Sequence, residues 1–349
     1  MEWREQPLTA ADVAIAIRLI LGREPKGEEE LTHHMPHATL GRLRDAFLAC
    51  EEFAIANRGL LRRHYAVPMH LLRPMAVPGV QGLFEEPSLT SPVSQLCTAG
   101  QLFDPAYAAL CDRIGLTPSL HRKPWELVWI AAVLERAGKL GPGHRFLGFG
   151  CGEEPLPSFF ARQGVSVLAT DAPYDIIANQ GWDSTNQHAS GPDTLFRADL
   201  VSREVFDRQV GFRAVDMNAI PPDLQAFDAC WSACALEHLG SIEQGLRFIE
   251  NSLATLRPGG IAVHTTEFNL GSDEDTIDQP GLCLFRRQDI ERLLVRLVEA
   301  GHKPWPVNLH PGAGELDQHI DLPPYNLPHL KLDVAGYVTG SIGIVVERG

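Results

Sequence analysis

The stretch RFLGFGCGEEPLPSFFARQGVSVLATD, residues 145–171, decides the fold that this sequence predicts. Its pattern predicts a buried strand over 145–150, a glycine turn, a helix over 155–163 and a second strand over 165–170 that ends at Asp171. This strand, helix and strand unit has about the length that a parallel crossover needs. We therefore expect an α/β fold built on a Rossmann-like, doubly wound sheet.

The glycine turn predicts a site for a nucleoside. Gly148, Gly150 and Gly152 let the backbone turn sharply and come close to a ligand. The helix that follows presents its free N–H groups to whatever binds there. Asp171 ends the second strand, where its carboxylate could accept hydrogen bonds from a ribose diol. A tight turn without a ligand is the alternative interpretation.

The residues after the turn indicate which nucleoside. A dinucleotide fingerprint requires a glycine at position 153, but the chain has Glu153 followed by Glu154. Two acids at the mouth of the turn would repel a pyrophosphate and would suit a cationic ligand such as a sulfonium. Here the residues resemble motif I of the class I S-adenosylmethionine-dependent methyltransferases. The resemblance extends from about residue 123 to the C-terminus, and the LRPGG turn at 256–260 is a frequent companion of motif I.

The resemblance implies a seven-stranded sheet whose last strand lies antiparallel between the fifth and the sixth. A helix over 125–137 is expected to precede the first strand. After the second strand, the remaining strands are expected at 212–218, 227–234, 261–266, 303–309 and 338–347.

The resemblance also implies the residues that bind S-adenosylmethionine. Asp216 is expected against the adenine amino group, with Met217 and Asn218 along the ring, and Lys123 could meet a carboxylate, as could His121. A solvated basic cap is the alternative for Lys123 and His121. The full set of expected cofactor-binding residues is Gly148, Gly150, Gly152, Glu153, Asp171, Ala172, Asp216, Met217, Asn218, Ser232, Glu237 and Lys123.

Catalysis of methyl transfer to an alcohol requires a base that accepts the hydroxyl proton. His238 follows the predicted fourth strand, near the expected topological switch point, and is the first candidate. His264 and Glu267 are the next candidates, although His264 inside a strand is equally typical of a core histidine. Glu237 could orient His238 or help to hold the cofactor.

A metal ion is possible but is not predicted. One segment holds several potential ligands within twelve residues, but without the spacing that fixes two ligands on one face; these are His310, Glu315, Asp317, His319 and Asp321. Loop residues that cap turns are the preferred interpretation of this segment.

The chain divides into three parts by pattern. Residues 1–65 predict a helical accessory domain, residues 66–93 a proline- and glycine-rich linker or arm, and residues 94–349 the methyltransferase domain. Within the last part, the polar loop 174–208 is a candidate substrate lid, and residues 309–332 form an insert.

Composition excludes several partners. The formal charge of −14 over 349 residues disfavours nucleic acid, because phosphate binding requires clustered Lys and Arg. The N-terminus lacks a secretory pattern and no apolar run is long enough to span a membrane. Seven cysteines without CxxC spacing indicate reduced thiols, so a cytoplasmic location is predicted.

The acceptor is predicted from resemblance alone. The N-terminal helices resemble, over about fifty residues, a small domain found beside polysaccharide-synthesis enzymes. Together, the N-terminal helices, the polar loop and the C-terminal insert resemble methyltransferases that accompany glycosyltransferases in bacterial surface-polysaccharide assembly. This implies O-methylation of a sugar hydroxyl in a glycan or glycoconjugate, with self-association or a glycosyltransferase complex through the N-terminal helices. The alternatives are O-methylation of a small molecule or natural product, an NAD-dependent oxidoreductase, and a non-catalytic nucleoside-binding scaffold.

Overall fold

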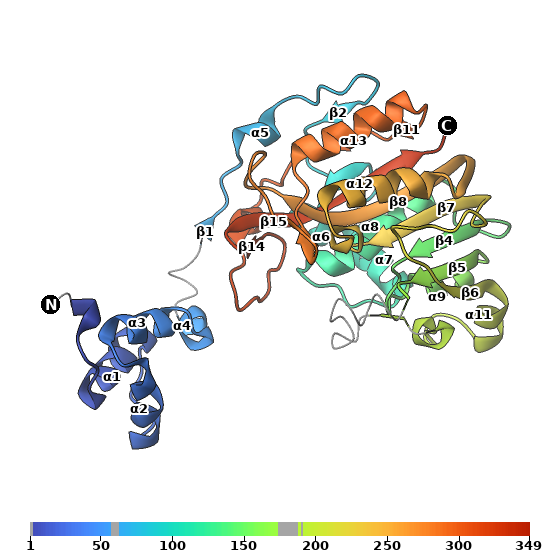
Figure 1. The fold of residues 1–349 in the computed structure, drawn as a ribbon. Helices are drawn as coiled ribbons and strands as arrows, with labels where there is room; N and C mark the ends of the chain where they lie inside the picture. The colour runs from blue at the N-terminus through green and yellow to red at the C-terminus, as the bar shows by residue number, and fades with distance from the viewer. Residues whose placement is uncertain (1–2, 57–62, 174–187, 190) are drawn as a thin grey trace.

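A mixed, mostly parallel β-sheet forms the centre of the molecule, with helices on both faces (Figure 1). The computed structural model describes residues 3–56, 63–173, 188–189 and 191–349. In spatial order the strands are β2 (Gly82–Leu83), β12 (Val307–Asn308), β3 (Ser94–Leu96), β15 (Tyr337–Glu347), β8 (Leu256–Asn269), β7 (Phe227–Ala233), β4 (Arg145–Phe149), β5 (Ser166–Asp171) and β6 (Val210–Ala214). Two further strands, β11 (Lys303–Pro304) and β14 (Leu332–Val334), also pair with β15.

The order of the strands confirms the doubly wound core but corrects the strand count. Strands β6, β5, β4, β7 and β8 are parallel, and β15 runs antiparallel beside β8. On its other side β15 pairs antiparallel with β11 and β3, so the expected antiparallel insertion is present. The prediction of seven strands is wrong, because the short strands β2, β3, β12 and β14 extend the sheet to 11.

The strand, helix and strand unit predicted over residues 145–171 is present in the structure. Strand β4, helix α9 (Leu156–Arg162) and strand β5 follow one another, and β4 pairs with β5 in parallel. Helix α8 (Arg122–Arg136) begins three residues before the predicted start, because the His121 ring accepts a hydrogen bond from the Lys123 N–H and caps it.

Two strands differ in length from their predictions. Strand β6 ends at Ala214, so Asp216 lies in the loop beyond it. Strand β8 continues to Asn269, so Glu267 lies inside a strand.

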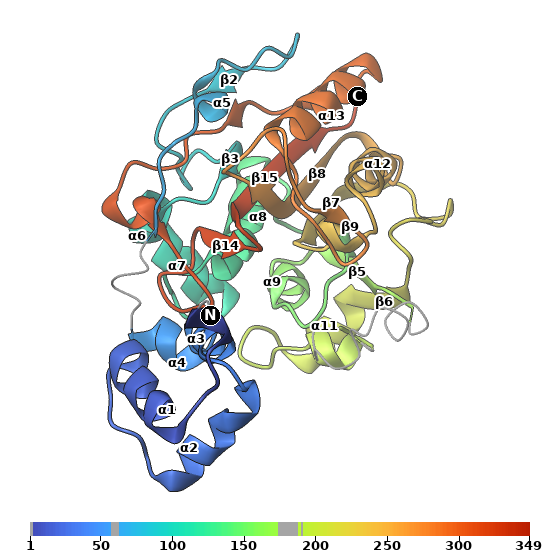
Figure 2. The ribbon, with the colours of Figure 1, turned by 60° about the vertical axis from the view of Figure 1, so that its left-hand side comes forward.

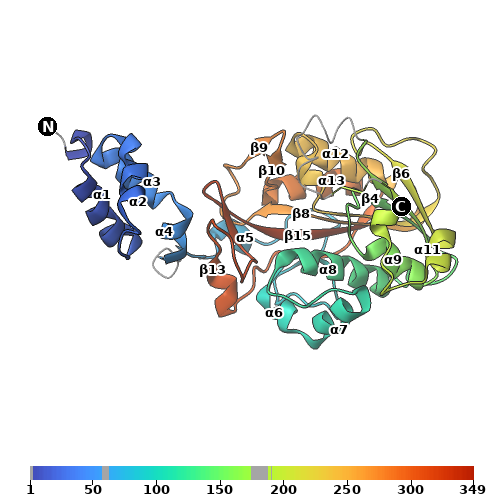
Figure 3. The same cartoon turned by 90° about the horizontal axis from the view of Figure 1, so that it is seen from below.

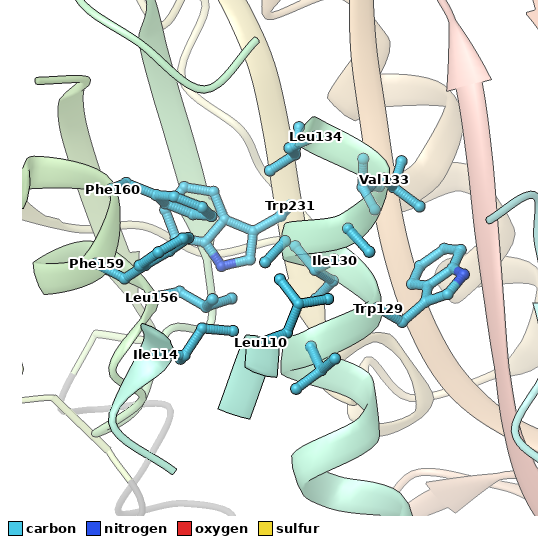
Figure 4. Packing of buried hydrophobic residues seen from close by; sticks show 14 of the residues in the cluster. Leu110, Ile114, Trp129, Ile130, Val133, Leu134, Leu156, Phe159, Phe160 and Trp231 are labelled. Atoms are coloured by element: carbon cyan, nitrogen blue, oxygen red, sulfur yellow. The ribbon is translucent and has the colours of Figure 1, made fainter. Parts of the chain in front are cut away.

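The core consists of two layers, one on each face of the sheet. Helices α7 (Pro105–Ile114), α8 and α9 cover one face, and α12 (Ile242–Leu253) and α13 (Arg287–Glu299) cover the other (Figure 3). Figure 4 shows Trp231 of β7 between the aromatic residues of α9 and the aliphatic residues of α8. Its ring meets Phe160 edge to face at 5.1 Å, an arrangement that aromatic pairs favour.

Residues 3–56 form a group of short helices that lies apart from the sheet (Figures 1 and 2). They have their own apolar core, which includes Val13, Ile17, Leu43 and Phe47. The elements are η1 (Trp3–Glu5), α1 (Ala10–Ala16), η2 (Ile17–Leu21), α2 (Glu28–His34), η3 (Met35–His37), α3 (Leu40–Leu48) and α4 (Glu51–Ala56). The domain boundary at residue 65 and a role in association stay predictions.

Residues 66–93 lie along the large domain as an arm. Arg287, only 1% exposed, donates hydrogen bonds from its guanidinium group to the carbonyl oxygens of Arg73 at 2.7 Å and Pro74 at 2.9 Å. Helix α5 (Met69–Leu72) and strand β2 belong to this arm, and β2 pairs in parallel with β12. A buried guanidinium group that satisfies the carbonyl groups of an irregular segment fixes that segment to α13.

The predicted lid falls largely outside the described residues, since 174–187 and 190 are not described. The described remainder of 174–208 contains η5 (Pro192–Leu195) and the first part of α11 (Arg203–Gln209). The insert 309–332 contains η7 (Glu315–Gln318), β13 (His319–Ile320), which pairs with β1 (Arg63–His64), and the first residue of β14. The other short elements are α6 (Ala99–Phe103), η6 (Leu236–His238), β9 (Asp278–Gln279) and β10 (Leu282–Cys283).

Helix length and hydropathy decide whether a segment of the chain can cross a membrane. In the part of the chain that the structure describes, no helix is both long enough and apolar enough to span a bilayer. The cytoplasmic location stays a prediction.

Candidate functional site

The carboxyl ends of β4, β6 and β7 meet at the glycine bend. Gly150 and Gly152 have φ angles of +58° and +53°, which few residues other than glycine adopt. A Cβ atom on Gly150 would lie 2.9 Å from Cβ of Ala235 and 3.4 Å from Sδ of Met217. The structure therefore brings the predicted adenine-site residue Met217 to the bend.

Gly148 serves the packing of the bend. A Cβ atom at this position would lie 2.4 Å from Sγ of Cys151 and 2.5 Å from the ring of Trp231. Both neighbours are buried. A side chain at position 148 is excluded by the Trp231 indole, and contact of the Gly148 backbone with a cofactor stays a prediction.

Asp171 holds the bend through backbone N–H groups. Its carboxylate accepts hydrogen bonds from Gly152 at 3.1 Å, from Ala172 at 2.7 Å and from Ala189 at 2.8 Å. The side chain is buried. His188 Nδ1 also lies 3.4 Å from this carboxylate, so a ribose diol would compete with four partners, of which His188 and Ala189 lie outside the bend. Ala172 contributes its N–H to Asp171, and contact of either residue with a cofactor stays a prediction.

Hydrogen bonds fix the conformation of the loop after β6. Asp216 Oδ1 accepts the Asn218 N–H at 2.8 Å, which is a local turn, and Asn218 Nδ2 donates to the Leu239 carbonyl at 3.1 Å. Of the three predicted adenine-site residues in this loop, Met217 is the one whose side chain reaches the bend.

The two acids after the bend have different environments. Glu153 is exposed, as expected for the mouth of a site. Glu154 Oε1 accepts the Trp231 Nε1–H at 2.6 Å, and burial raises the pKa of Glu154 to about 8. Glu154 is therefore mostly protonated at neutral pH. This corrects the expectation that both acids place negative charge at the mouth.

Ser232 and His264 are core residues on the α12 side of the sheet. His264 is fully buried, with Nδ1 at 2.8 Å from Ser232 Oγ and Nε2 at 3.0 Å from Ser252 Oγ. Burial lowers the pKa of His264 to about 3. Alternation along β7 and β8 turns these side chains toward α12. This corrects their predicted roles in cofactor binding and in catalysis, because both ring nitrogens of His264 are taken and no acceptor reaches them.

His238 lies on η6, just beyond β7. Its Nδ1 is 2.8 Å from the Gly281 carbonyl oxygen, so Nδ1 carries the proton in this hydrogen bond. The side chain is half-buried. Its role as the base stays a prediction.

The first turns of α8 and the carboxyl ends of β7 and β8 bring together a set of polar side chains, most of them buried, which we call the polar cluster: Arg122, Lys123, Glu126, Cys234, Glu237 and Glu267. Lys123 is the exposed member, with 46% of its side chain accessible. The Arg122 guanidinium group contacts the Glu267 carboxylate and lies 3.4 Å from Glu126 Oε1 and 3.1 Å from Ser341 Oγ. Lys123 Nζ lies 3.5 Å from Glu126 Oε2, so this lysine already has a carboxylate partner inside the protein. Its predicted contact with a cofactor carboxylate is not tested by this geometry.

Glu237 and Glu267 lie close together in the polar cluster, but they have different hydrogen-bond and ion-pair partners. Thr266 Oγ1 donates to Glu237 at 3.1 Å, and Thr339 Oγ1 donates to Glu267 at 3.0 Å. Burial raises the pKa of Glu237. Burial acts on Glu267 in the same direction, but the charges of Arg122 and Lys123 and the hydrogen bonds from Thr339 and Arg122 together outweigh it and hold the pKa of Glu267 below its usual range. Glu267 is thus committed to an ion pair, and its role as a base stays a prediction.

A histidine–aspartate pair that the sequence analysis missed lies beside the polar cluster. His329 Nδ1 is 2.6 Å from Asp321 Oδ2, and the His329 ring packs against His121 with centroids 4.3 Å apart. The backbone of His329 is fixed to the start of α8, since Arg122 donates its N–H to the His329 carbonyl at 3.0 Å. The eight-residue separation inside a proline-rich loop gave no local signal for this pair.

The insert does not gather its acids and histidines into one site. Asp317 pairs with the buried Lys331 at 3.5 Å, His310 lies 3.5 Å from Glu86, and Asp321 binds His329. Among the described residues, the insert contributes to no group of three potential metal ligands.

Known proteins were compared with the chain in sequence and in structure. No protein-family model matches the sequence, and the comparison with curated proteins finds no match. An S-adenosylmethionine-dependent methyltransferase from Mesorhizobium loti is similar in structure, at 14% identity and a TM-score of 0.39 over 64% of this chain and 98% of that chain. The CcbJ methyltransferase from Streptomyces caelestis has 12% identity and a TM-score of 0.36, over 63% of this chain and 94% of that chain.

A protein with a different activity is similar to this chain to the same degree. The [4+2]-cyclase SpnF has 20% identity and a TM-score of 0.37, over 64% of this chain and 76% of that chain. Because these similarities are weak, the activity of this chain is inferred from its own residues.

Proposed function

We propose that this chain is an S-adenosylmethionine-dependent methyltransferase that methylates a hydroxyl group of a sugar in a glycan or glycoconjugate. The observation that carries the proposal is the position of β15, antiparallel between β8 and β11, in a sheet whose glycine bend follows β4. A dinucleotide-binding sheet has six parallel strands in the order 3-2-1-4-5-6. The antiparallel β15 and the glutamate at position 153 both favour the methyl donor over NAD.

The residues at the bend fit an adenosyl donor in position and in chemistry. Gly150 and Gly152 keep the backbone open beside Met217, whose flexible apolar side chain suits an adenine face. Asp171 is placed for a ribose if the Ala189 N–H gives up its hydrogen bond. When bound, the donor supplies a methyl group on a sulfonium, which is an excellent leaving group.

The chain must then orient the acceptor hydroxyl and take its proton. His329 suits this task because Asp321 fixes its tautomer through Nδ1 and leaves Nε2 as the proton acceptor. Burial lowers the pKa of His329, so its imidazole is neutral at neutral pH and able to act as a base. His238 remains the second candidate for this role.

Support for a sugar acceptor comes from the resemblance of the N-terminal helices, the polar loop and the C-terminal insert to methyltransferases of surface-polysaccharide assembly. A test begins with donor binding by the full chain, measured by titration calorimetry. We expect binding of S-adenosylmethionine and none of NAD. Binding of NAD alone would overturn the proposal.

Transfer of labelled methyl from S-adenosylmethionine to a panel of glycans then tests the acceptor. Labelled glycan supports the proposal, whereas labelled phenols or aliphatic alcohols from a matched panel would favour the small-molecule alternative. Donor binding without transfer to either panel would favour the non-catalytic scaffold.

The base is tested with His329→Gln and His238→Gln in the same transfer assay. We expect His329→Gln to lower kcat by about 10²- to 10⁴-fold, the usual contribution of a general base. Asp321→Asn should lower kcat less and shift the pH profile. His302→Gln, a change outside this site, serves as the control. A larger loss in His238→Gln than in His329→Gln would return the role to His238.

A further inference from the structure

Three side chains of the polar cluster converge on one point. Cys234 Sγ, a carboxylate oxygen of Glu237 and a carboxylate oxygen of Glu267 all lie within 4.8 Å of one another. They come from three elements, since Cys234 directly follows β7, Glu237 lies on η6 and Glu267 lies in β8. Among the described residues, no other group of histidine, cysteine and acidic side chains comes this close.

The charges of the polar cluster are not balanced. Glu126, Glu237 and Glu267 are at most 6% exposed, and the two cationic side chains of the cluster are Arg122 and Lys123. Arg122 contacts Glu267 and Glu126, and Lys123 contacts Glu126. Within the described chain, Glu237 takes part in no salt bridge although it is 1% exposed. Burial of a charged carboxylate is costly, so a cation bound beside Glu237 would stabilise its charged form.

An orphaned donor lies in the same cluster. The Nε–H of Arg122 is buried and has no hydrogen-bond partner, in a side chain that is 8% exposed. Buried polar groups without partners are rare in native proteins. An N–H donor requires an acceptor, so this group fits a water or substrate oxygen held at the cluster and not the cation itself.

Glu237 and Glu267 keep free lone pairs after they accept hydrogen bonds from threonine hydroxyls. Glu237 accepts one hydrogen bond from Thr266, and Glu267 accepts one from Thr339 besides its contact with Arg122. A carboxylate offers about four lone-pair positions, so each acid retains capacity for a metal ion. Hydroxyl groups that orient the ligating carboxylates are the usual second layer of a metal site.

We propose that Cys234, Glu237 and Glu267 bind one divalent cation, with zinc preferred. Oxygen ligands alone would favour magnesium or calcium, but a cysteine sulfur favours zinc. A tetrahedral zinc ion needs donor atoms about 3.3 to 3.8 Å apart, from bond lengths of about 2.0 to 2.3 Å. The three donor atoms must therefore move closer together by about 1 Å, and rotation of their side chains allows this movement.

The proposed ion balances the cluster. Zinc binding releases the Cys234 thiol proton to solvent, and the resulting thiolate with three carboxylates carries four negative charges. These match the two positive charges of zinc together with Arg122 and Lys123. The fourth position stays open to water or to a substrate atom, as in catalytic zinc sites.

The site lies next to the glycine bend, because Ala235 follows Cys234 and contacts the position of a Gly150 Cβ atom. Zinc binding itself is independent of the proposed methyl transfer. Its failure and the failure of that function are therefore separable.

Calorimetric titration of the full chain, after removal of metals by a chelator, tests the site with zinc chloride, manganese chloride and magnesium chloride. We expect one zinc ion per chain, with manganese weaker and magnesium weakest. Cys234→Ser and Glu237→Gln should each weaken zinc binding at least about 100-fold, more than the loss usual for outer-layer residues. Cys50→Ser, a change to a half-buried thiol in the N-terminal helices, should leave binding unchanged.

The unaltered protein provides a second readout that does not depend on the folding of variants. Alkylation of Cys234, followed by peptide mass spectrometry, should slow at least about 10-fold when zinc is present, while alkylation of Cys50 should not. Cobalt should give a thiolate-to-metal absorption band. Absence of one-to-one zinc binding, equal loss in Cys50→Ser, or unprotected Cys234 would overturn the proposal.

Discussion

Two sets of carboxylates at the same edge of the sheet are stabilised in different ways. Asp171 is surrounded by backbone donors from Gly152, Ala172 and Ala189. Glu237 and Glu267 are supported by side chains, namely two threonines and one arginine. A carboxylate that accepts backbone N–H groups fixes the shape of a loop, whereas one that depends on side chains can exchange partners with a ligand.

The comparison assigns separate tasks to the two regions. The glycine bend with Asp171 forms a frame whose hydrogen bonds are satisfied within the chain. Among the described residues, the polar cluster retains a buried arginine N–H without a hydrogen-bond partner and an acid, Glu237, that forms no salt bridge, so it is the part of the edge that can accept a ligand.

The largest expected effect follows removal of the cation from the polar cluster. Arg122→Met leaves Glu267 and Glu126 buried without this partner, and loss of one member of a buried pair costs about 3 to 5 kcal/mol. We expect the free energy of unfolding, measured with urea, to fall by that amount. Arg113→Met removes the exposed pair with Glu135 and should cost no more than about 1 kcal/mol. Equal costs would mean that the polar cluster is not stabilised by its ion pairs.

Asp171→Asn sharpens the distinction between a frame and a binding residue. The amide cannot accept all of the backbone N–H groups, and a buried donor left without a partner costs about 1 to 3 kcal/mol. We expect this loss in thermal and urea unfolding without any ligand present. Asp223→Asn, which alters an exposed acid paired with Arg213, is the matched control. A variant of normal stability with weakened donor binding would instead make Asp171 a ligand contact.

The smallest expected effect concerns the pH dependence of the bend. Burial raises the pKa of Glu154 to about 8 from an ordinary value of 4.5. The folded chain therefore holds a proton that the unfolded chain releases between these values, so stability is full below pH about 4.5 and falls as the pH rises toward about 8. The loss is at most about 1.4 kcal/mol per pH unit.

Urea unfolding over this pH range measures the slope. Glu154→Gln keeps an acceptor for the Trp231 indole and removes the titration, so its slope should be flatter than that of the wild-type chain. Glu153→Gln, at the exposed neighbouring position, should keep the wild-type slope. A wild-type slope in Glu154→Gln would show that the carboxyl does not stay protonated in the fold.

Local signals in the sequence predicted the frame correctly. Alternation and glycine positions over 145–171 predicted β4, α9 and β5 to within a residue or two. These features depend on neighbours within a few residues, so the sequence alone contains them. The predicted bend residues Gly150 and Met217 also come together in the structure.

The tertiary structure decided which of the remaining candidates share a site. His264 and Ser232 looked catalytic or cofactor-binding from their strand positions, but the orientation of β7 and β8 turns both into the core beneath α12. His329 gave no signal, because its distance from the polar cluster depends on how a proline-rich insert folds back onto α8.

The sequence by itself determined the parallel unit of β4, α9 and β5 and the approximate positions of the other long strands, because periodicity and turn chemistry act between near neighbours in the chain. Only the tertiary structure decided the polar cluster, in which Arg122 meets Ser341 across 219 residues. Contacts of this separation depend on strand order and side-chain direction together, and neither is a property of any one segment.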